Sequence, residues 1–426
     1  MDVNLPLALL AGLSPAQFMR RHWQKKPLLV RQAIPGFLPF LSRAALFKLA
    51  AGEDVESRLI VKEEKGWSMK NGPLTPKNVP ALKKEGWTLL VQGVDLHDPG
   101  AHALLQQFRF VPDARLDDLM VSFATTGGGV GPHFDSYDVF LFQASGRRRW
   151  KIGLQKDLAL QPGVPLKILQ NFKAQEEFVL ETGDMLYLPP RYAHDGIAEA
   201  CVGPDGKPVD CMTYSIGFRA PAQTELAAEL LQRLAEFGDD ATGAALGADG
   251  RRPLRQPKIY SDPGQPATSA PAALPEALTA FAAEAVLEAL KNPLALGCAL
   301  GEYLTEPKPS VWFDEPLQPW NGEAAKAGAA SIQLDLRSRM MYDSDHIFIN
   351  GESHRAKGAD ASLMNRLADQ RSLAGQDLRK ASASALALLG DWHEVGWLLQ
   401  VPTGLGRITT SSSRPAVASM SKKEFK

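Results

Sequence analysis

The feature that most constrains the fold is a series of short strand-like runs in the first half of the chain. The runs are rich in β-branched, aromatic and other apolar residues, and Gly, Pro and Asp separate them. Strands of this length and spacing predict a mainly β domain built as a sandwich or barrel. The clearest runs are Pro27–Val30, Trp87–Val91, Leu119–Phe123, Asp138–Phe142, Trp150–Ile152 and Met185–Leu188.

The pattern changes after Arg219. Thr224–Phe237 and Pro275–Lys291 carry apolar residues at helical spacing, which predicts two amphipathic helices. Two helices bury only a small core, so we expect them to pack on another surface. That surface belongs either to the rest of the chain or to a second copy of it.

A third pattern runs from Glu306 to Gln400. It combines strand-like and helical segments with one strong hairpin-turn signal, which is consistent with a winged-helix module. The turn is Asn350-Gly351, and the segments are Ile332–Met341, Asp345–Asn350, Ala361–Gln370, Ser382–Leu389 and Trp392–Leu399, the last as strand or helix. The Ser/Thr-rich tail after Gln400 is expected to be flexible.

Composition excludes several classes of protein. The formal net charge of the 426 residues is -1, and no basic recognition helix is evident, which argues against DNA binding. Three cysteines without a CxxC pair make a disulfide framework or a cysteine zinc site improbable. Without a basic signal-peptide start or a long uncharged apolar stretch, we expect a cytoplasmic protein with no membrane segment.

The most informative motif is the run from Gly127 to Asp135, GGGVGPHFD. If this run is a strand, His133 and Asp135 lie on one face, because side chains alternate with a period of two. Iron(II) in oxygenases is held by two histidines and one carboxylate, with the opposite face open. A His-x-Asp pair alone is weak evidence, since a strand histidine bonded to a surface aspartate gives the same pattern.

His194 supplies the missing third ligand. It follows the apolar run Met185–Leu188 and a Pro-Pro pair, so we expect it just past the end of a strand. Alone it would be read as a loop histidine that caps a turn. Together with His133 and Asp135 it predicts a metal site.

Arg148 lies in the strand that follows the His-x-Asp segment. In that strand Arg148 shares a face with Trp150, while Arg147 and Arg149 point the other way. A buried cation needs an anionic partner, and the distal carboxylate of 2-oxoglutarate suits a guanidinium. Ser122 could add a hydroxyl donor. The alternative is that the three arginines form a solvated cluster.

These motifs resemble those of Jumonji-C (JmjC) oxygenases, which have the cupin or double-stranded β-helix fold. The chain more narrowly resembles the bacterial ribosomal oxygenases, which hydroxylate an arginine of large-subunit ribosomal protein sixteen. The resemblance covers roughly the first half of the chain. It rests on Phe18–Pro27 (FMRRHWQKKP), Asp117–Ser122 (DDLMVS), Gly127–Asp135 (GGGVGPHFD), Tyr137–Phe142 (YDVFLF), Gly146–Trp150 (GRRRW) and Gly183–His194 (GDMLYLPPRYAH).

The resemblance implies a JmjC/cupin catalytic domain (1–220), a helical dimerisation region (221–305), a winged-helix-like α+β domain (306–400) and a flexible tail (401–426). It implies that His133, Asp135 and His194 bind Fe(II), and that Arg148 and Ser122 bind 2-oxoglutarate. The implied reaction uses O2 to hydroxylate the β-carbon of a target arginine. The implied partners are a large-subunit ribosomal protein and a second copy of the chain.

Three residues are candidates for binding the target arginine: Asp118, Tyr137 and Ser215. Tyr137 should share the face of Asp135, whereas Asp118 could equally be a solvent-facing acid. Two other functions remain open. One is a JmjC-type protein demethylase, which shares the iron site, and the other is a non-catalytic cupin scaffold that binds the ribosome or RNA.

Overall fold

The computed structural model describes residues 2–64, 66–237, 258–261, 263, 272, 274–291 and 293–402. Nearly all of the predicted tail (401–426) lies outside the described residues. None of the described helices is long and apolar enough to cross a bilayer.

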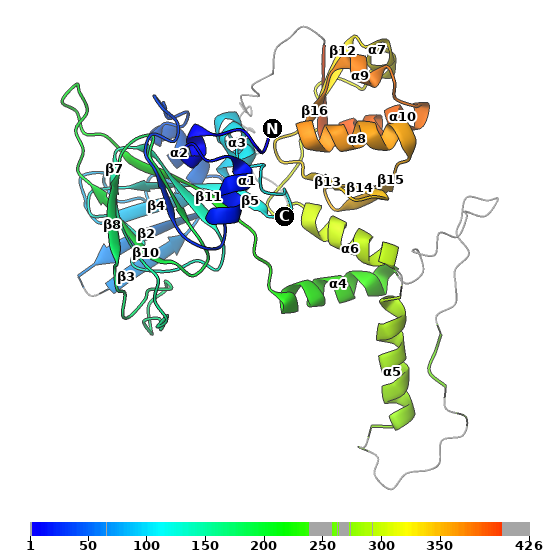
Figure 1. Cartoon of the computed structure of the whole chain (residues 1–426), viewed down its shortest axis with the longest axis horizontal. Helices are drawn as coiled ribbons and strands as arrows, with labels where there is room; N and C mark the ends of the chain where they lie inside the picture. Colours follow the sequence, from blue (N-terminus) through cyan, green and yellow to red (C-terminus); the bar gives the residue numbers. More distant parts are fainter. Residues whose placement is uncertain are drawn as a thin grey trace, which may run out of the picture.

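Two antiparallel sheets face each other in the first domain (Figure 1). The larger has eight strands in the order β1-β9-β6-β11-β5-β4-β2-β3, and the smaller has the order β10-β7-β8. The predicted β-rich cupin architecture is therefore confirmed. The strands are β1 (Leu28–Val30), β2 (Ser57–Glu63), β3 (Gly66–Asn71), β4 (Trp87–Val91), β5 (Leu116–Ala124), β6 (Val139–Ser145), β7 (Arg147–Gly153), β8 (Glu176–Leu180), β9 (Met185–Leu188), β10 (Ala193–Glu199) and β11 (Cys211–Phe218).

Side chains along β5 alternate between the two faces of the larger sheet. Leu119, Val121 and Phe123 join the main hydrophobic cluster, which also includes residues of the N-terminal helices. Asp118 and Ser122 point to the opposite face, toward the smaller sheet. The covering helices are α1 (Pro15–Arg21) with a Ser14 capping box, α2 (Arg43–Ala50) capped by Ser42, and α3 (Pro99–Gln106) capped by Asp98.

Three of the described helices lie between the first domain and the C-terminal domain: α4 (Gln223–Phe237), α5 (Glu276–Ala289) and α6 (Pro293–Thr305). The first two confirm the predicted amphipathic helices, whereas the sequence did not predict α6. Helices α4 and α6 pack together through Leu234, Ala295 and Ala299. Helix α5 extends away from both domains (Figure 1), and several of its apolar side chains are exposed.

The C-terminal domain has its own core, in which Leu367, Leu389 and Trp392 are buried. Asn350 and Gly351, both with positive φ, form the predicted turn between two strands. Trp392–Leu399 contains both predicted states, the end of a helix and the start of a strand. The elements are α7 (Gly322–Ala327), β12 (Ala330–Leu334), β13 (Met340–Tyr342), β14 (His346–Ile349), β15 (Glu352–Arg355), α8 (Gly358–Gln370), β16 (Ser372–Leu373), α9 (Gly375–Leu378), α10 (Ala383–Glu394) and β17 (Leu398–Pro402).

Candidate active site

The predicted metal ligands converge, although the local structure differs from the prediction. His133 and Asp135 do not lie on a regular strand but in the loop between β5 and β6. Instead His133 forms an isolated antiparallel bridge with His194, with backbone N···O distances of 2.9 and 2.8 Å. His194 does not follow a strand end but lies in β10. This bridge places the two imidazole rings 4.2 Å apart, centroid to centroid.

The donor set fits a divalent iron ion. His133, Asp135 and His194 offer ligand atoms that all lie within 4.8 Å of one another. In each histidine Nδ1 lies 2.9 Å from a backbone carbonyl oxygen, of Gly131 and Tyr192 respectively, which leaves Nε2 for a metal. Burial and the neighbouring His133 lower the pKa of His194 to about 4, so its ring is neutral near pH 7.

The glycine run before His133 permits close backbone approaches. A Cβ on Gly128 would lie 2.4 Å from the Trp87 carbonyl oxygen, and one on Gly129 would lie 2.5 Å from that of Gly196. Any larger residue would push this segment away from the two sheets. The glycines therefore hold the segment between the sheets, where His133 can meet β10.

Arg148 fits a carboxylate ligand. It lies on β7 with 3% of its surface exposed, and its Nε and Nη2 atoms have no hydrogen-bond partner in the described part of the chain. Its guanidinium lies 5.8 Å from the Trp150 ring centroid. Arg147 and Arg149 point outward, as predicted, and pair with glutamates. Burying an unpaired guanidinium is costly, so this arrangement suits a site that receives an anion.

The remaining predicted residues lie near this site. Ser122 is buried, and its hydroxyl lies 3.4 Å from the Thr213 carbonyl oxygen. Ser215 pairs with Met120, the β5 residue between Asp118 and Ser122 on the inner face. Tyr137 lies before β6, and 39% of its surface is exposed. Burial of its hydroxyl raises the pKa of Tyr137, and the negative charges of Asp135 and Asp118 raise it further. Tyr137 is thus close to both a metal ligand and Asp118.

Asp118 is not a solvent-facing acid, since only 5% of its surface is exposed. Its Oδ2 accepts hydrogen bonds from the Gly93 N–H at 3.0 Å and from Lys308 Nζ at 3.4 Å. The sequence analysis did not single out Lys308, because its position beyond the helical region gives no signal of proximity to β5.

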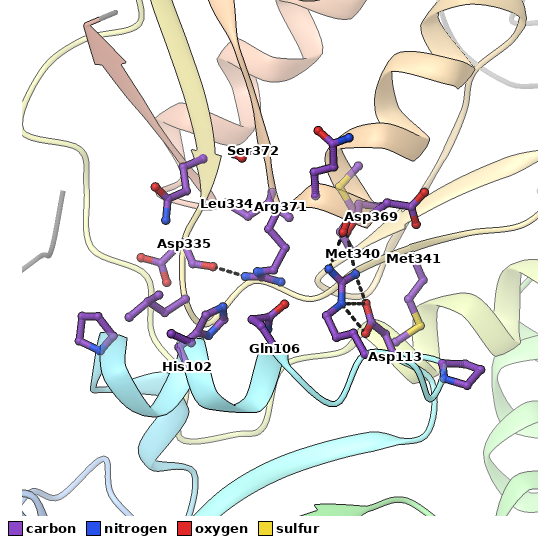
Figure 2. A pocket seen from close by; sticks show the side chains of 18 of the residues that line it. His102, Gln106, Asp113, Leu334, Asp335, Met340, Met341, Asp369, Arg371 and Ser372 are labelled. Carbon is purple, nitrogen blue, oxygen red and sulfur yellow. Dashed lines mark hydrogen bonds and ion pairs between the residues drawn. The ribbon is translucent and has the colours of Figure 1, made fainter. Parts of the chain in front are cut away.

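A large cavity of about 1080 Å³ lies elsewhere, between the first domain and the C-terminal domain (Figure 2). His102 and Gln106 of α3 line one side, and Met340 and Arg371 line the other. None of the predicted site residues lines it. Acidic and basic residues line it together, so it has no evident preference for ligand charge.

Together, the fold and the convergent donors define a metal-dependent oxygenase barrel. Comparison with known proteins makes the class specific. A JmjC-domain model matches residues 103–226, and a ROXA-like winged-helix model matches residues 288–399.

The chain is 34% identical to the ribosomal protein uL16 3-hydroxylase of Escherichia coli over 342 residues, which cover 79% of this chain and 84% of that protein. It is 36% identical to a probable ribosomal oxygenase of Haemophilus influenzae, over 50% of this chain and 52% of that protein.

Solved structures of the E. coli ribosomal oxygenase YcfD are also similar. One has a TM-score of 0.73 with 29% identity, and the match covers 90% of this chain and 97% of that one. Another, in complex with cobalt and 2-oxoglutarate, has a TM-score of 0.72 with 28% identity over 91% and 98% of the two chains. The chain belongs to the JmjC-domain ribosomal oxygenases.

Proposed function

We propose that this protein hydroxylates the β-carbon of an arginine side chain in the large-subunit ribosomal protein uL16. Its family membership makes it a 2-oxoglutarate-dependent oxygenase, which excludes the scaffold alternative. The observation that carries the proposal is the combination of the converged triad with the buried, unpaired Arg148. The E. coli relative that is 34% identical is named for uL16 3-hydroxylation, and this supports the choice of target.

In this proposal His133, Asp135 and His194 hold Fe(II), and Arg148 binds the distal carboxylate of 2-oxoglutarate with help from Ser122. When bound, iron, 2-oxoglutarate and O2 supply the oxidising chemistry, which yields succinate, CO2 and a hydroxylated carbon. The chain itself orients the reactants. The carbonyls of Gly131 and Tyr192 fix the imidazole rings, and Trp150 packs beside His194 at 5.8 Å between ring centroids.

The proposed role of Asp118, Tyr137 and Ser215 is to hold the target side chain. Asp118 supplies a buried negative charge for a guanidinium, and Tyr137 supplies an aromatic surface near Asp135. A cation held by these groups would lie beside the metal ligands, as hydroxylation of a nearby carbon requires.

The function is tested with peptides that together span the uL16 of the same organism. The purified protein, loaded with Fe(II) under anaerobic conditions, is mixed with 2-oxoglutarate and each peptide before O2 is admitted. We expect succinate and a peptide heavier by one oxygen atom on arginine, in equal amounts. Succinate formation without modification of any uL16 peptide would refute the choice of target. Loss of a methyl group from a methylated peptide would instead support the demethylase alternative.

We also propose that the chain divides into a catalytic domain (1–220), a helical region (221–305), a winged-helix-like domain (306–400) and a tail (401–426). In this division the helical region forms a homodimer interface. Val286 and Leu287 on α5 are 49% and 62% exposed, and Leu290, which caps its C-terminus, is 45% exposed. Apolar groups that project this far into solvent are better covered by a second copy. With a ribosomal substrate, we place the reaction in the cytoplasm.

Replacing both Val286 and Leu287 by aspartate should convert the dimer to a monomer, because each buried charge would oppose association. Light scattering coupled to size exclusion measures the mass directly. The matched control replaces Glu284, an exposed residue of the same helix, by lysine and should leave the dimer intact. A wild-type protein that is monomeric at micromolar concentration would contradict this proposal.

A further inference from the structure

The segment after α6 brings a cation to the inner face of the catalytic domain. Lys308 Nζ lies 3.4 Å from Asp118 Oδ2 and 3.6 Å from Asp117 Oδ1. Pro307 and Pro309 flank Lys308 and restrict its backbone. A residue far along the chain therefore contacts a carboxylate that our proposed function places in the substrate site.

The anchoring of this segment is extensive. Arg219, at the end of β11, donates to the Leu304 carbonyl oxygen at 3.3 Å and pairs with Asp117 at 3.5 Å. Glu306 forms an ion pair with Arg233 of α4. These contacts hold the end of α6 against the start of β5, so the position of Lys308 is fixed by the fold rather than by its own flexible side chain.

The two oxygens of the Asp118 carboxylate differ in their surroundings. Oδ2 accepts from both Gly93 and Lys308, as described above. Oδ1 accepts no hydrogen bond within the described part of the chain, and it faces Gly217 of β11, where a Cβ would lie 3.7 Å away. Because Gly217 has no side chain, this position of β11 does not cover Oδ1.

Lys308 opposes the effects of burial and of acidic neighbours on Asp118. Burial raises the pKa of the Asp118 carboxyl, Lys308 opposes this, and Asp117 adds to it. Burial and Asp118 likewise raise the pKa of Asp95 to about 7. The charged and titratable groups that act on this cluster are Asp95 from the 3-10 turn before α3, Asp117 from β5, Tyr137 from the loop before β6, Lys308, Arg219 and Arg339.

We propose that Lys308 is a positioning residue of the substrate site. Its ammonium stabilises the ionised form of Asp118 and orients the carboxylate through Oδ2, so that Oδ1 can receive the guanidinium of the target arginine. This inference rests on the proposed function. It extends that function because Lys308, which lies outside the segment matched by the JmjC model, then helps to determine the preference for a cationic substrate.

The experiment measures hydroxylation of the wild-type enzyme and of Lys308→Met with the best uL16 peptide, between pH 5.5 and 8.5. Without the ammonium, Asp118 protonates at higher pH. We therefore expect the acid limb of kcat/KM for the peptide to move up by about one pH unit. On the acid limb the KM for the peptide should rise by up to roughly tenfold, whereas the KM for 2-oxoglutarate should not follow.

A second arm uses the same peptide with citrulline in place of the target arginine. Binding is followed by fluorescence anisotropy, which needs no turnover. The wild-type protein should prefer the arginine peptide, and Lys308→Met should lose most of that preference. Lys308→Arg keeps the cation and should restore both the preference and the pH profile. The matched control is Lys207→Met, because the Lys207 side chain is 81% exposed.

The possible results distinguish a failure of the role of Lys308 from a failure of the proposed hydroxylase function. An unchanged pH profile and unchanged arginine preference in a folded Lys308→Met protein overturn the role of Lys308 and leave the function intact. If Lys308→Met does not fold, Lys308→Gln keeps hydrogen-bond donors without the charge and is expected to show the same shift. A wild-type enzyme that modifies no arginine peptide overturns both.

Discussion

Replacing His194 by alanine is expected to abolish hydroxylation. Removing a residue that only hydrogen-bonds a metal ligand typically costs roughly 10–100-fold in activity, and we expect the loss in kcat/KM here to be well beyond that. His194 is 2% exposed and contributes one of only three protein donors in the triad. Two donors cannot hold the metal with the same affinity. Metal analysis after dialysis should therefore show less than stoichiometric iron in the variant.

The control for this prediction is His354→Ala. His354 lies on β15 of the C-terminal domain, pairs with Glu352 at 3.4 Å and is absent from the triad. It should retain wild-type metal content and turnover. If His194→Ala keeps full iron content and more than a tenth of the activity, the metal assignment is wrong.

The second large effect is expected for Arg148→Met. Loss of the guanidinium should raise the KM for 2-oxoglutarate about 100-fold, because charge-assisted hydrogen bonds each contribute ~1.5–3 kcal/mol. The same change should stabilise the protein without co-substrate by ~1–3 kcal/mol, because it removes a buried cation that has unpaired donors. Turnover at varied 2-oxoglutarate measures the KM, and thermal unfolding with and without 2-oxoglutarate measures the loss of affinity and the gain in stability.

Arg149→Met is the matched control, one position along the same strand. The Arg149 side chain is 39% exposed and pairs with Glu177 and Glu199 on the outer surface. Its loss should leave the KM for 2-oxoglutarate unchanged and lower stability slightly. An Arg148→Met protein that is less stable than wild type and binds 2-oxoglutarate normally would show that Arg148 has a structural role instead.

The sequence predicts a helix or strand correctly where its local residue pattern alone favours the observed structure. Trp87–Val91 is the strand β4 with the predicted bounds, and Thr224–Phe237 falls within α4. The sequence does not predict α6, because Gly297 and Gly301 weaken its helical propensity. The structure explains Gly301, since a Cβ there would lie 2.4 Å from the Phe348 ring. Tertiary packing, which a local pattern does not contain, selects this glycine.

The sequence predicts which residues form the metal site, but it does not predict the backbone structure that brings them together. His133, Asp135 and His194 were identified because their residue types and spacing fit a metal site, yet the strand assumed for His133 is a single bridge to His194. The inward direction of Arg148 followed from simple alternation, since β7 is regular. Lys308 could not be found this way, because its contact with Asp118 depends on how α6 packs against the end of β11.

The most direct test of the central claim is mass spectrometry of uL16 from cells of the source organism. Ribosomes from wild-type cells, from cells that lack this gene and from deletion cells that express His194→Ala are compared. We predict an arginine of uL16 heavier by one oxygen atom on its β-carbon in the wild type and in deletion cells that carry the wild-type gene, but not in the other two strains. An identical uL16 in all strains, with or without the modification, would contradict the account.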